Sequence, residues 1–143
     1  MITGVSFSTI AHSTEDLEKV QRAITNLMPE SARAAVSINA AEARGHHGNL
    51  ITVLSTEIRD KELAVETAGF LMRLLPAADR MGIRDHIDIY YDGHSSLFLR
   101  VDKQSSYLGN PRLSSSDDVI RVKIGFLVRG KGLEAVLKLF ELA

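Results

Sequence analysis

An alternating run from Val119 to Val128 constrains the fold of this chain more than any other stretch. Apolar residues occupy every second position from Ile120 onward, and the positions between them include Arg121 and Lys123. A strand that alternates in this way has one face in a core and the other in water. The chain is therefore expected to build a sheet that is covered on one face.

Four further segments have the apolar pattern of strands. They are Ile2–Ala11, Ala32–Ala41, Leu50–Ile58 and a strand that begins at Leu97. The second and third are joined by the short polar connection 42–49, which predicts an antiparallel hairpin.

Helical spacing of apolar residues predicts four helices between and after these strands. Ser13 is expected to cap the first, with Asp16 as its capping-box partner, and Asp60 to cap the second. The third begins at about Asp79, and the last follows Gly132. The order β-α-β-β-α-α-β-β-α predicts a two-layer α+β fold with a largely antiparallel sheet covered by helices on one face. We expect one such domain over residues 1–143.

Composition excludes several classes of protein. The chain has 143 residues, 45% of them hydrophobic, which suits a single packed core. It has no cysteine, so disulfides, thiolate metal sites and a cysteine nucleophile are excluded. No apolar run is long enough for a membrane span, and the first residues lack the pattern of a signal peptide. We therefore expect a cytoplasmic protein that does not contact a membrane.

The formal net charge of −1 conceals an asymmetry. Residues 1–96 carry 9 Lys and Arg against 13 Asp and Glu, a net of −4. Residues 97–131 carry 7 against 3, a net of +4. A basic segment on a neutral chain is typical of anion binding, and equally of solvated strand faces.

The hairpin loop Arg44–Asn49 is the first candidate site. Its two glycines allow turns that leave amide N–H groups free for a phosphate, and Arg44 adds a fork of donors. The alternative is an ordinary loop that needs glycine for its geometry. His46 and His47 are adjacent on extended backbone and so point to opposite faces, which disfavours a metal site.

The run Asp102–Tyr107 is the second candidate site. Asp102 is expected to cap a short helical turn after the strand. Lys103 and Gln104 then offer a phosphate contact and a hydrogen-bonding amide, with Tyr107 on the same side of the turn. These groups suit an unstacked nucleotide, although Tyr107 could instead pack on the sheet.

Arg100, Arg121 and Lys123 form the third candidate, a basic stripe on the uncovered sheet face. The alternative is a solvated face without a ligand. Catalytic signatures are absent from the sequence: it contains no Gly-x-Ser-x-Gly, phosphate loop or His-Glu-x-x-His. We expect no cofactor.

Four blocks of the chain resemble an archaeal family described as predicted RNA-binding or exosome-associated proteins. The blocks are His12–Asp16 (His-x-Thr-Glu-Asp), Gly45–Asn49 (Gly-His-x-Gly-Asn), Asp102–Gly109 (Asp-Lys-Gln-x-x-Tyr-x-Gly) and the acidic turn and basic strand 117–123. The resemblance implies a fold similar to the ribosomal protein that binds 5S rRNA. It also implies RNA binding connected to RNA processing or the exosome.

The chain departs from the family pattern at three places. His47 stands where an aromatic is common, Leu50 where proline is common, and Ser105-Ser106 where small apolar residues are usual. The serine pair predicts that the Asp102 turn is more exposed than in the family.

Three hypotheses follow. The first is a non-enzymatic RNA-binding domain that uses the residues of all three candidate sites together with one further arginine. These residues are Arg44, His46, His47, Asn49, Arg100, Lys103, Gln104, Tyr107, Arg112, Arg121 and Lys123. The second is a protein-interaction module or homodimer, indicated by the small apolar residues around Ala32–Ala41. The third is an enzyme for a small phosphorylated ligand, which requires the two glycine-bearing loops to meet.

Overall fold

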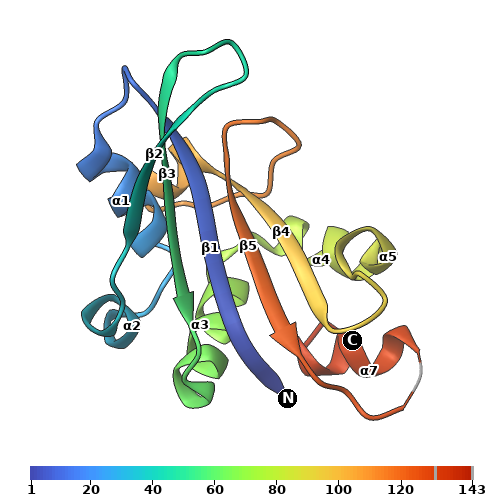
Figure 1. Ribbon diagram of the computed structural model, residues 1–143. Helices are drawn as coiled ribbons and strands as arrows, with labels where there is room; N and C mark the ends of the chain where they lie inside the picture. Colours follow the sequence, from blue (N-terminus) through green and yellow to red (C-terminus); the bar gives the residue numbers. More distant parts are fainter. Residues whose placement is uncertain (131, 143) are drawn as a thin grey trace.

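The computed structural model describes residues 1–130 and 132–142, and its strands and helices are interspersed along the chain (Figure 1). The strands are β1 (Ile2–His12), β2 (Asn39–Arg44), β3 (Leu50–Ile58), β4 (Ser96–Asp102) and β5 (Val119–Phe126). The longer helices are α1 (Leu17–Thr25), α3 (Lys61–Leu74), α4 (Ala77–Asp85) and α7 (Leu133–Leu139). The shorter ones are α2 (Glu30–Ala35), α5 (Ile87–Tyr90) and α6 (Lys103–Tyr107).

The five strands form one sheet in the order β2-β3-β1-β5-β4, and every neighbouring pair is antiparallel. The β2–β3 hairpin is confirmed, with Asn39 opposite Ser55 and Arg44 opposite Leu50. β1 is the central strand. Its residues alternate between the two faces of the sheet, and Val5, Phe7, Thr9 and Ala11 are all buried on one face.

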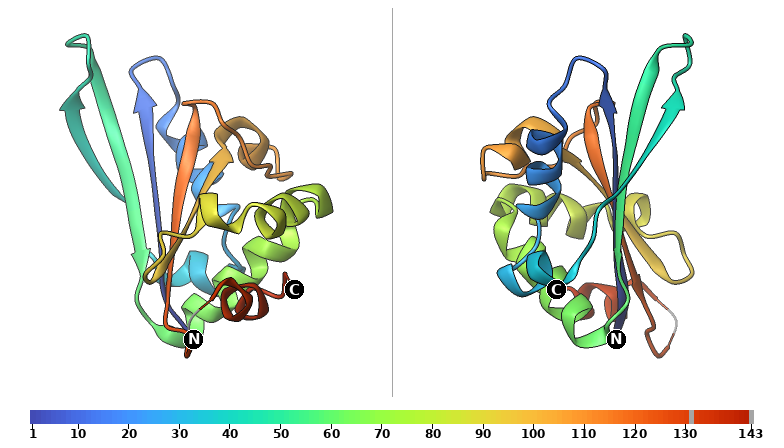
Figure 2. Two further views of the ribbon diagram at one scale, coloured as in Figure 1. Left: turned by 90° about the vertical axis from the view of Figure 1, so that its right-hand side faces the viewer. Right: turned by 60° about the vertical axis from the view of Figure 1, so that its left-hand side comes forward.

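The helices cover one face of the sheet and leave the other bare, as the two side views in Figure 2 show. The core lies between the two layers, where the apolar stripes of the helices meet the inward-facing strand residues. Ile24, Leu71, Ile83 and Leu99 are each no more than 1% exposed. The predicted two-layer α+β fold is confirmed, with three short helices added to the expected order.

The prediction of a strand over Ala32–Ala41 is wrong. Residues Glu30–Ala35 form helix α2, which begins after Pro29 and buries Ala32. Alanine is the best helix former, so its alternation in this segment carried no strand signal. The strand begins only at Asn39 and extends to Arg44, through residues expected to belong to the loop.

The helix caps are partly as predicted. Asp60 accepts a hydrogen bond from the Leu63 amide (2.9 Å), and Asp102 accepts one from the Ser105 amide (2.8 Å). Ser13 is not the first cap, since α1 begins later and Asp16 is its N-cap, bonded to the Glu18 amide (2.9 Å). Within the described residues, no helix has the length and apolar character needed to cross a membrane.

Candidate nucleic-acid interface

The bare face of the sheet brings the predicted basic stripe together. On this face Arg100 of β4 lies directly opposite Arg121 of β5, and Phe98 lies opposite Lys123. On the other side of β5, Ser8 of β1 is opposite Arg121 and Ser6 is opposite Lys123. The six side chains form two adjacent rows across three strands, which we call the open-face patch: Ser6, Ser8, Phe98, Arg100, Arg121 and Lys123.

The patch concentrates positive charge in a way that folding alone does not favour. Like charges directly opposite each other on neighbouring strands destabilise a sheet, and Arg100 and Arg121 are such a pair. Arg100 is partly compensated, since its guanidinium donates to the Ser116 carbonyl (2.6 Å) and lies 3.7 Å from the Asp117 carboxylate. Arg121 has neither a hydrogen bond nor an ion pair within the described residues. The patch is thus suited to receive an anion.

Phe98 supplies an aromatic surface among these cations. Its side chain is 46% exposed, and the Lys123 ammonium lies 5.7 Å from the centre of its ring. An exposed aromatic beside cations is the arrangement on which single-stranded nucleic acids stack their bases. Sequence reasoning missed Phe98 as a site residue, although it stands in phase with Arg100 and out of phase with the buried Leu97 and Leu99.

Small side chains and one Glu–Arg ion pair complete the open face. Ser55 of β3 lies opposite Ser8, so the middle of the sheet presents hydroxyls with little bulk. Glu57 lies opposite Ser6, and its carboxylate is 3.1 Å from the Arg59 guanidinium. The hydrogen bond and charge of Glu57 raise the pKa of Arg59. The local negative charge of Glu57 is therefore already balanced.

The Lys103 side chain is buried, whereas the sequence predicts that it contacts a phosphate. Its side chain is only 7% exposed, and its ammonium donates to the Ile10 carbonyl at 2.6 Å. It also lies 2.8 Å from the Asp118 carboxylate and 3.2 Å from that of Glu15. We call this group the Lys103 cluster. It joins β1, the start of α1, α6 and the start of β5, so the ammonium is already satisfied inside the protein.

The rest of the α6 turn is also tied to the core. Ser106 is fully buried and donates to the Ala23 carbonyl at 2.6 Å, so the expectation of a more exposed turn is wrong for this residue. The Asn26 amide donates to the carbonyls of Ser106 (2.9 Å) and Tyr107 (3.1 Å). Tyr107 is half-buried beside α1, with the Lys19 ammonium 5.9 Å from its ring centre, and Gln104 is exposed.

The hairpin loop is exposed and held by its own backbone. Gly48 has a φ of +81°, and its amide bonds to the Gly45 carbonyl at 2.9 Å. Arg44 donates to the Gly48 carbonyl at 3.0 Å, which leaves part of its fork free. His46 and His47 do not point to opposite faces as predicted, because they lie in a turn and not on extended backbone, and their rings meet edge to face with centres 5.2 Å apart. Asn49 is exposed with them.

The two loops do not form one site. The hairpin tip projects beyond the end of β1, whereas α6 lies behind the sheet on the helix side (Figures 1 and 2). β3 and β4 are three strand spacings apart in the sheet order, which is about 14 Å. The two cavities beside α6 are lined by no residue of the hairpin loop. Arg112 lies beside the α6 turn at the outer edge of β4 and is exposed. Its amide donates to the Ser105 hydroxyl at 3.2 Å, and its carbonyl accepts from the Asp102 amide at 2.8 Å.

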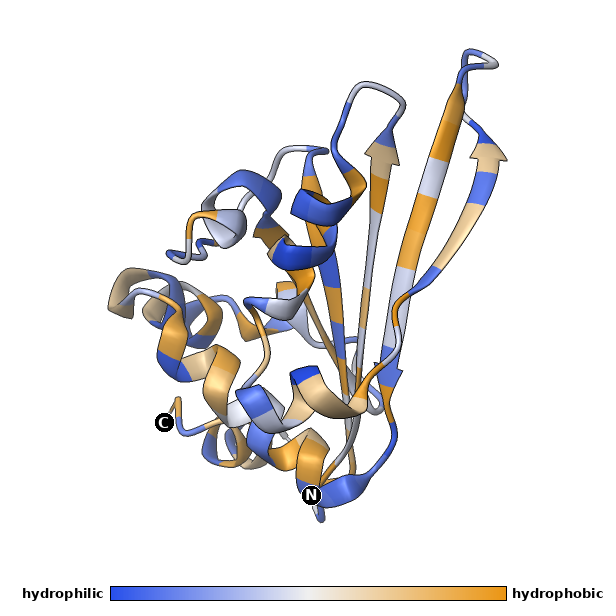
Figure 3. Ribbon diagram, turned by 90° about the vertical axis from the view of Figure 1, so that its left-hand side faces the viewer, coloured by the Kyte–Doolittle hydropathy of each residue, from blue (hydrophilic) through white to orange (hydrophobic). Residues whose placement is uncertain are grey.

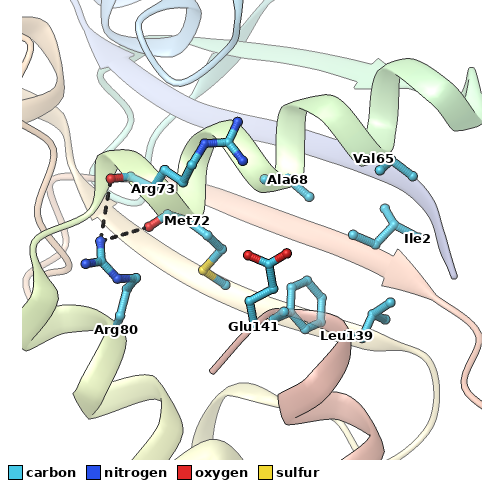
Figure 4. Close-up of a pocket in the computed structure, with 10 residues that line it drawn as sticks. Ile2, Val65, Ala68, Met72, Arg73, Arg80, Leu139 and Glu141 are labelled. Atoms are coloured by element: carbon cyan, nitrogen blue, oxygen red, sulfur yellow. Dashed lines mark hydrogen bonds between the residues drawn. The ribbon is translucent and has the colours of Figure 1, made fainter. Parts of the chain in front are cut away.

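A cavity of about 400 Å³ lies between α3 and α7 (Figure 4). Its walls include the apolar Val65, Met72 and Leu139. Arg80 lines it too, but its guanidinium caps the end of α3 by donating to the carbonyls of Met72 (3.2 Å) and Leu75. This cavity lies in the helix layer and shares no residue with the open-face patch. Across residues 1–130 and 132–142, no three histidine or carboxylate side chains gather as a metal site requires.

Antiparallel sheets with cations and an exposed aromatic on a bare face occur in one class of nucleic-acid-binding α+β domains. Comparison with known proteins agrees with this class. The chain belongs to the RNA_binding family, described as RNA binding, whose model matches residues 4–126. It is 33% identical over 136 residues to the RNA-binding protein PAB1135 of Pyrococcus abyssi, covering 94% of this chain and 88% of that protein.

Solved structures of relatives share the fold. The DUF54 protein AF2318 of Archaeoglobus fulgidus is 32% identical with a TM-score of 0.83, and the match covers 100% of both chains. The DUF54 protein Mth689 of Methanothermobacter thermautotrophicus is 28% identical with a TM-score of 0.77, covering 96% of this chain and 94% of that one. The predicted family is therefore confirmed, while the implied likeness to a ribosomal protein stays a prediction.

Proposed function

We propose that this protein binds single-stranded RNA on the open-face patch and performs no reaction on it. The observation that carries the proposal is the pairing of Arg100 with Arg121 beside Lys123 and Phe98. The cations would contact phosphates, and Phe98 would stack on a base. The family to which the chain belongs and the name of its Pyrococcus abyssi relative support RNA as the ligand.

Single strands fit the patch better than a duplex. The face is broad and lined by small serines, so an unpaired strand can approach it and splay its bases onto Phe98. A-form duplexes bury their bases, which gives an exposed phenyl ring nothing to stack on. We also propose a role in the cytoplasm in RNA processing, including the exosome, and that part rests on the family resemblance alone.

Binding rather than catalysis follows from the kinds of side chain in the patch. Guanidinium, ammonium, hydroxyl and phenyl groups hold a ligand, whereas general acid–base work needs a group that titrates near neutral pH. The hypothesis of an enzyme that uses both glycine-bearing loops loses its basis, because those loops do not meet. Contacts by Arg44, His46, His47, Asn49, Gln104, Tyr107 and Arg112 stay predictions, and Lys103 is left out of the proposed surface.

Fluorescence anisotropy with a labelled single-stranded RNA across a salt series tests the proposal. About three phosphates neutralised by Arg100, Arg121 and Lys123 give a slope of log K against log salt of about −2. The variant Arg121→Ala/Lys123→Ala should weaken binding and flatten the slope to about −0.7. The matched control is Arg22→Ala/Lys61→Ala, which removes two exposed cations from the helix layer. Equal losses in both variants would refute the assignment of the open face.

A further inference from the structure

The two edge strands of the sheet differ in whether their outer backbone groups are hydrogen-bonded. The outer edge of β4 is closed by the chain itself: the Asp102 amide donates to the Arg112 carbonyl (2.8 Å), and the Ser114 amide donates to the Arg100 carbonyl (2.9 Å). Tyr91 makes a further bridge to Leu97 on this edge. A sheet edge that is paired in this way cannot add another strand.

The outer edge of β2 has no such cover. All six residues of β2 are exposed, and they pair with β3 in unbroken register without a bulge. Within the described residues, β2 makes no backbone hydrogen bond beyond its pairing with β3. The strand also lacks proline and lysine, two devices that commonly block edge pairing, and its two charged residues, Glu42 and Arg44, have opposite signs. Figure 3 shows the hairpin projecting above the helix layer.

We propose that β2 pairs antiparallel with β2 of a second copy of this chain, so that two sheets join into one. The same face of the sheet must continue across such a junction, which limits the pairing to residues that share a face. Glu42 and Arg44 lie on the helix-side face of the sheet, which is the face of the buried Leu54. Their partners on β3, Thr52 and Leu50, occupy every second position before Leu54 and therefore point the same way as Leu54.

Among the registers that keep a common face, the charges of Glu42 and Arg44 favour one. Pairing centred on Ala43 places Glu42 of each copy opposite Arg44 of the other, which makes two symmetry-related ion pairs across the junction. Pairing centred on Glu42 instead places two glutamates opposite each other, which is unfavourable. Glu42 makes no ion pair within its own chain in the described residues, and Ala43 adds no bulk at the centre. The strand is therefore complementary to itself in the first register.

The junction would also double the proposed RNA surface, and this consequence rests on the proposed function. The twofold axis of the junction stands perpendicular to the sheet, so both bare faces point the same way. β5 lies three strand spacings from β2, so the two copies of β5 are seven spacings apart, about 34 Å. At about 3.4 Å per stacked nucleotide, one RNA of roughly ten nucleotides or more would reach both patches.

The dimer is tested without RNA, by sedimentation velocity of the full chain over a range of concentrations at low salt. A single strand pair is a small interface, so we expect a weak, concentration-dependent dimer. Glu42→Arg should raise its dissociation constant roughly tenfold or more, by replacing two attractive pairs with two repulsive ones. Arg44→Glu should do the same, and Glu42→Arg/Arg44→Glu should restore the dimer. Glu62→Arg, an equal charge change on exposed α3, should leave it unchanged.

Circular dichroism of each variant shows whether the monomer still folds. Glu42→Arg is the safest variant, because Arg44 also donates to the Gly48 carbonyl of its own loop. A wild-type chain that stays monomeric up to roughly millimolar concentration would overturn the proposal. A dimer whose dissociation constant does not change in Glu42→Arg or Arg44→Glu would also overturn the proposal. RNA binding by a strict monomer would leave the proposed function standing while removing this inference.

Discussion

Replacement of Lys103 by methionine separates a structural role from an RNA-contact role. Methionine keeps most of the apolar stem but removes the ammonium, so the Ile10 carbonyl and the carboxylates of Glu15 and Asp118 lose their shared donor. Removing one partner of a fully buried ion pair costs about 3–5 kcal/mol. The carboxylates here are 27% and 59% exposed, so water can replace the ammonium at both of them.

We therefore expect Lys103→Met to lower the free energy of unfolding by about 2–3 kcal/mol, which is within the range for a lost charge-assisted hydrogen bond. For a chain of this size, that corresponds to a fall in Tm of roughly 8–12 °C. Urea unfolding with an unchanged m-value measures the loss directly. Gln104→Ala is the matched control, because Gln104 is the exposed neighbour on the same turn and should leave stability nearly unchanged.

The affinity of folded Lys103→Met for RNA should equal that of the wild type, because the ammonium faces inward. A variant of normal stability that binds RNA tenfold more weakly would refute this reasoning. It would restore Lys103 as the phosphate contact that the sequence predicted.

Two further predictions concern single polar groups outside the patch. Thr67 is fully buried in α3, and its hydroxyl has no hydrogen-bond partner among residues 1–130 and 132–142, so Thr67→Val should raise the free energy of unfolding by about 1 kcal/mol in urea titration; a loss of stability would mean that the hydroxyl is satisfied. Desolvation raises the pKa of Asp92, but hydrogen bonds from the amides of His94, Ser96 and Ser95 outweigh it and hold the pKa below the ordinary 3.8. The stability that Asp92 contributes should be fully present above pH 3.8 and be lost as the pH falls through the lower folded value, so wild type and Asp92→Ala should converge in acid; a gap that stays constant through this range would contradict the shift.

The Lys103 cluster also explains why the family resemblance is visible in the sequence. Three of the four blocks that carry it meet at this ammonium. Glu15 comes from the first block, Lys103 from the third and Asp118 from the fourth. These blocks therefore record how β1, α6 and β5 are held together. The proposed RNA surface shares Arg121 and Lys123 with the fourth block, whereas Phe98 and Arg100 lie outside all four blocks.

Local patterns predicted most of the fold because they act over a few residues. The alternation in β5 predicts which face is bare, and the positions of Asp60 and Asp102 before a helical run predict that both are caps, as observed. The prediction of a strand over Ala32–Ala41 is wrong because alternating alanines are compatible with a helix as well as with a strand. Patterns of this kind indicate which face of a strand is buried and where a helix begins, but they say less about which distant residues a side chain contacts.

The position of Lys103 could not be read from its neighbours, because its partners are distant in the chain. Glu15 lies 88 residues away in sequence, and only the sheet order brings it close. A lysine beside an aspartate and a glutamine looks the same in sequence whether it points inward or outward. Phe98 is the opposite case, since its phase relative to Leu97 and Leu99 already placed it on the bare face.

Mapping of amide chemical shifts during titration with a short single-stranded RNA tests the central claim most directly. The open-face account predicts that the largest changes occur at Phe98, Arg100, Arg121 and Lys123 and at their partners Ser6 and Ser8 on β1. Changes confined to the hairpin loop 44–49, or to the α6 turn 103–107, would contradict it and assign RNA binding to a different part of the molecule.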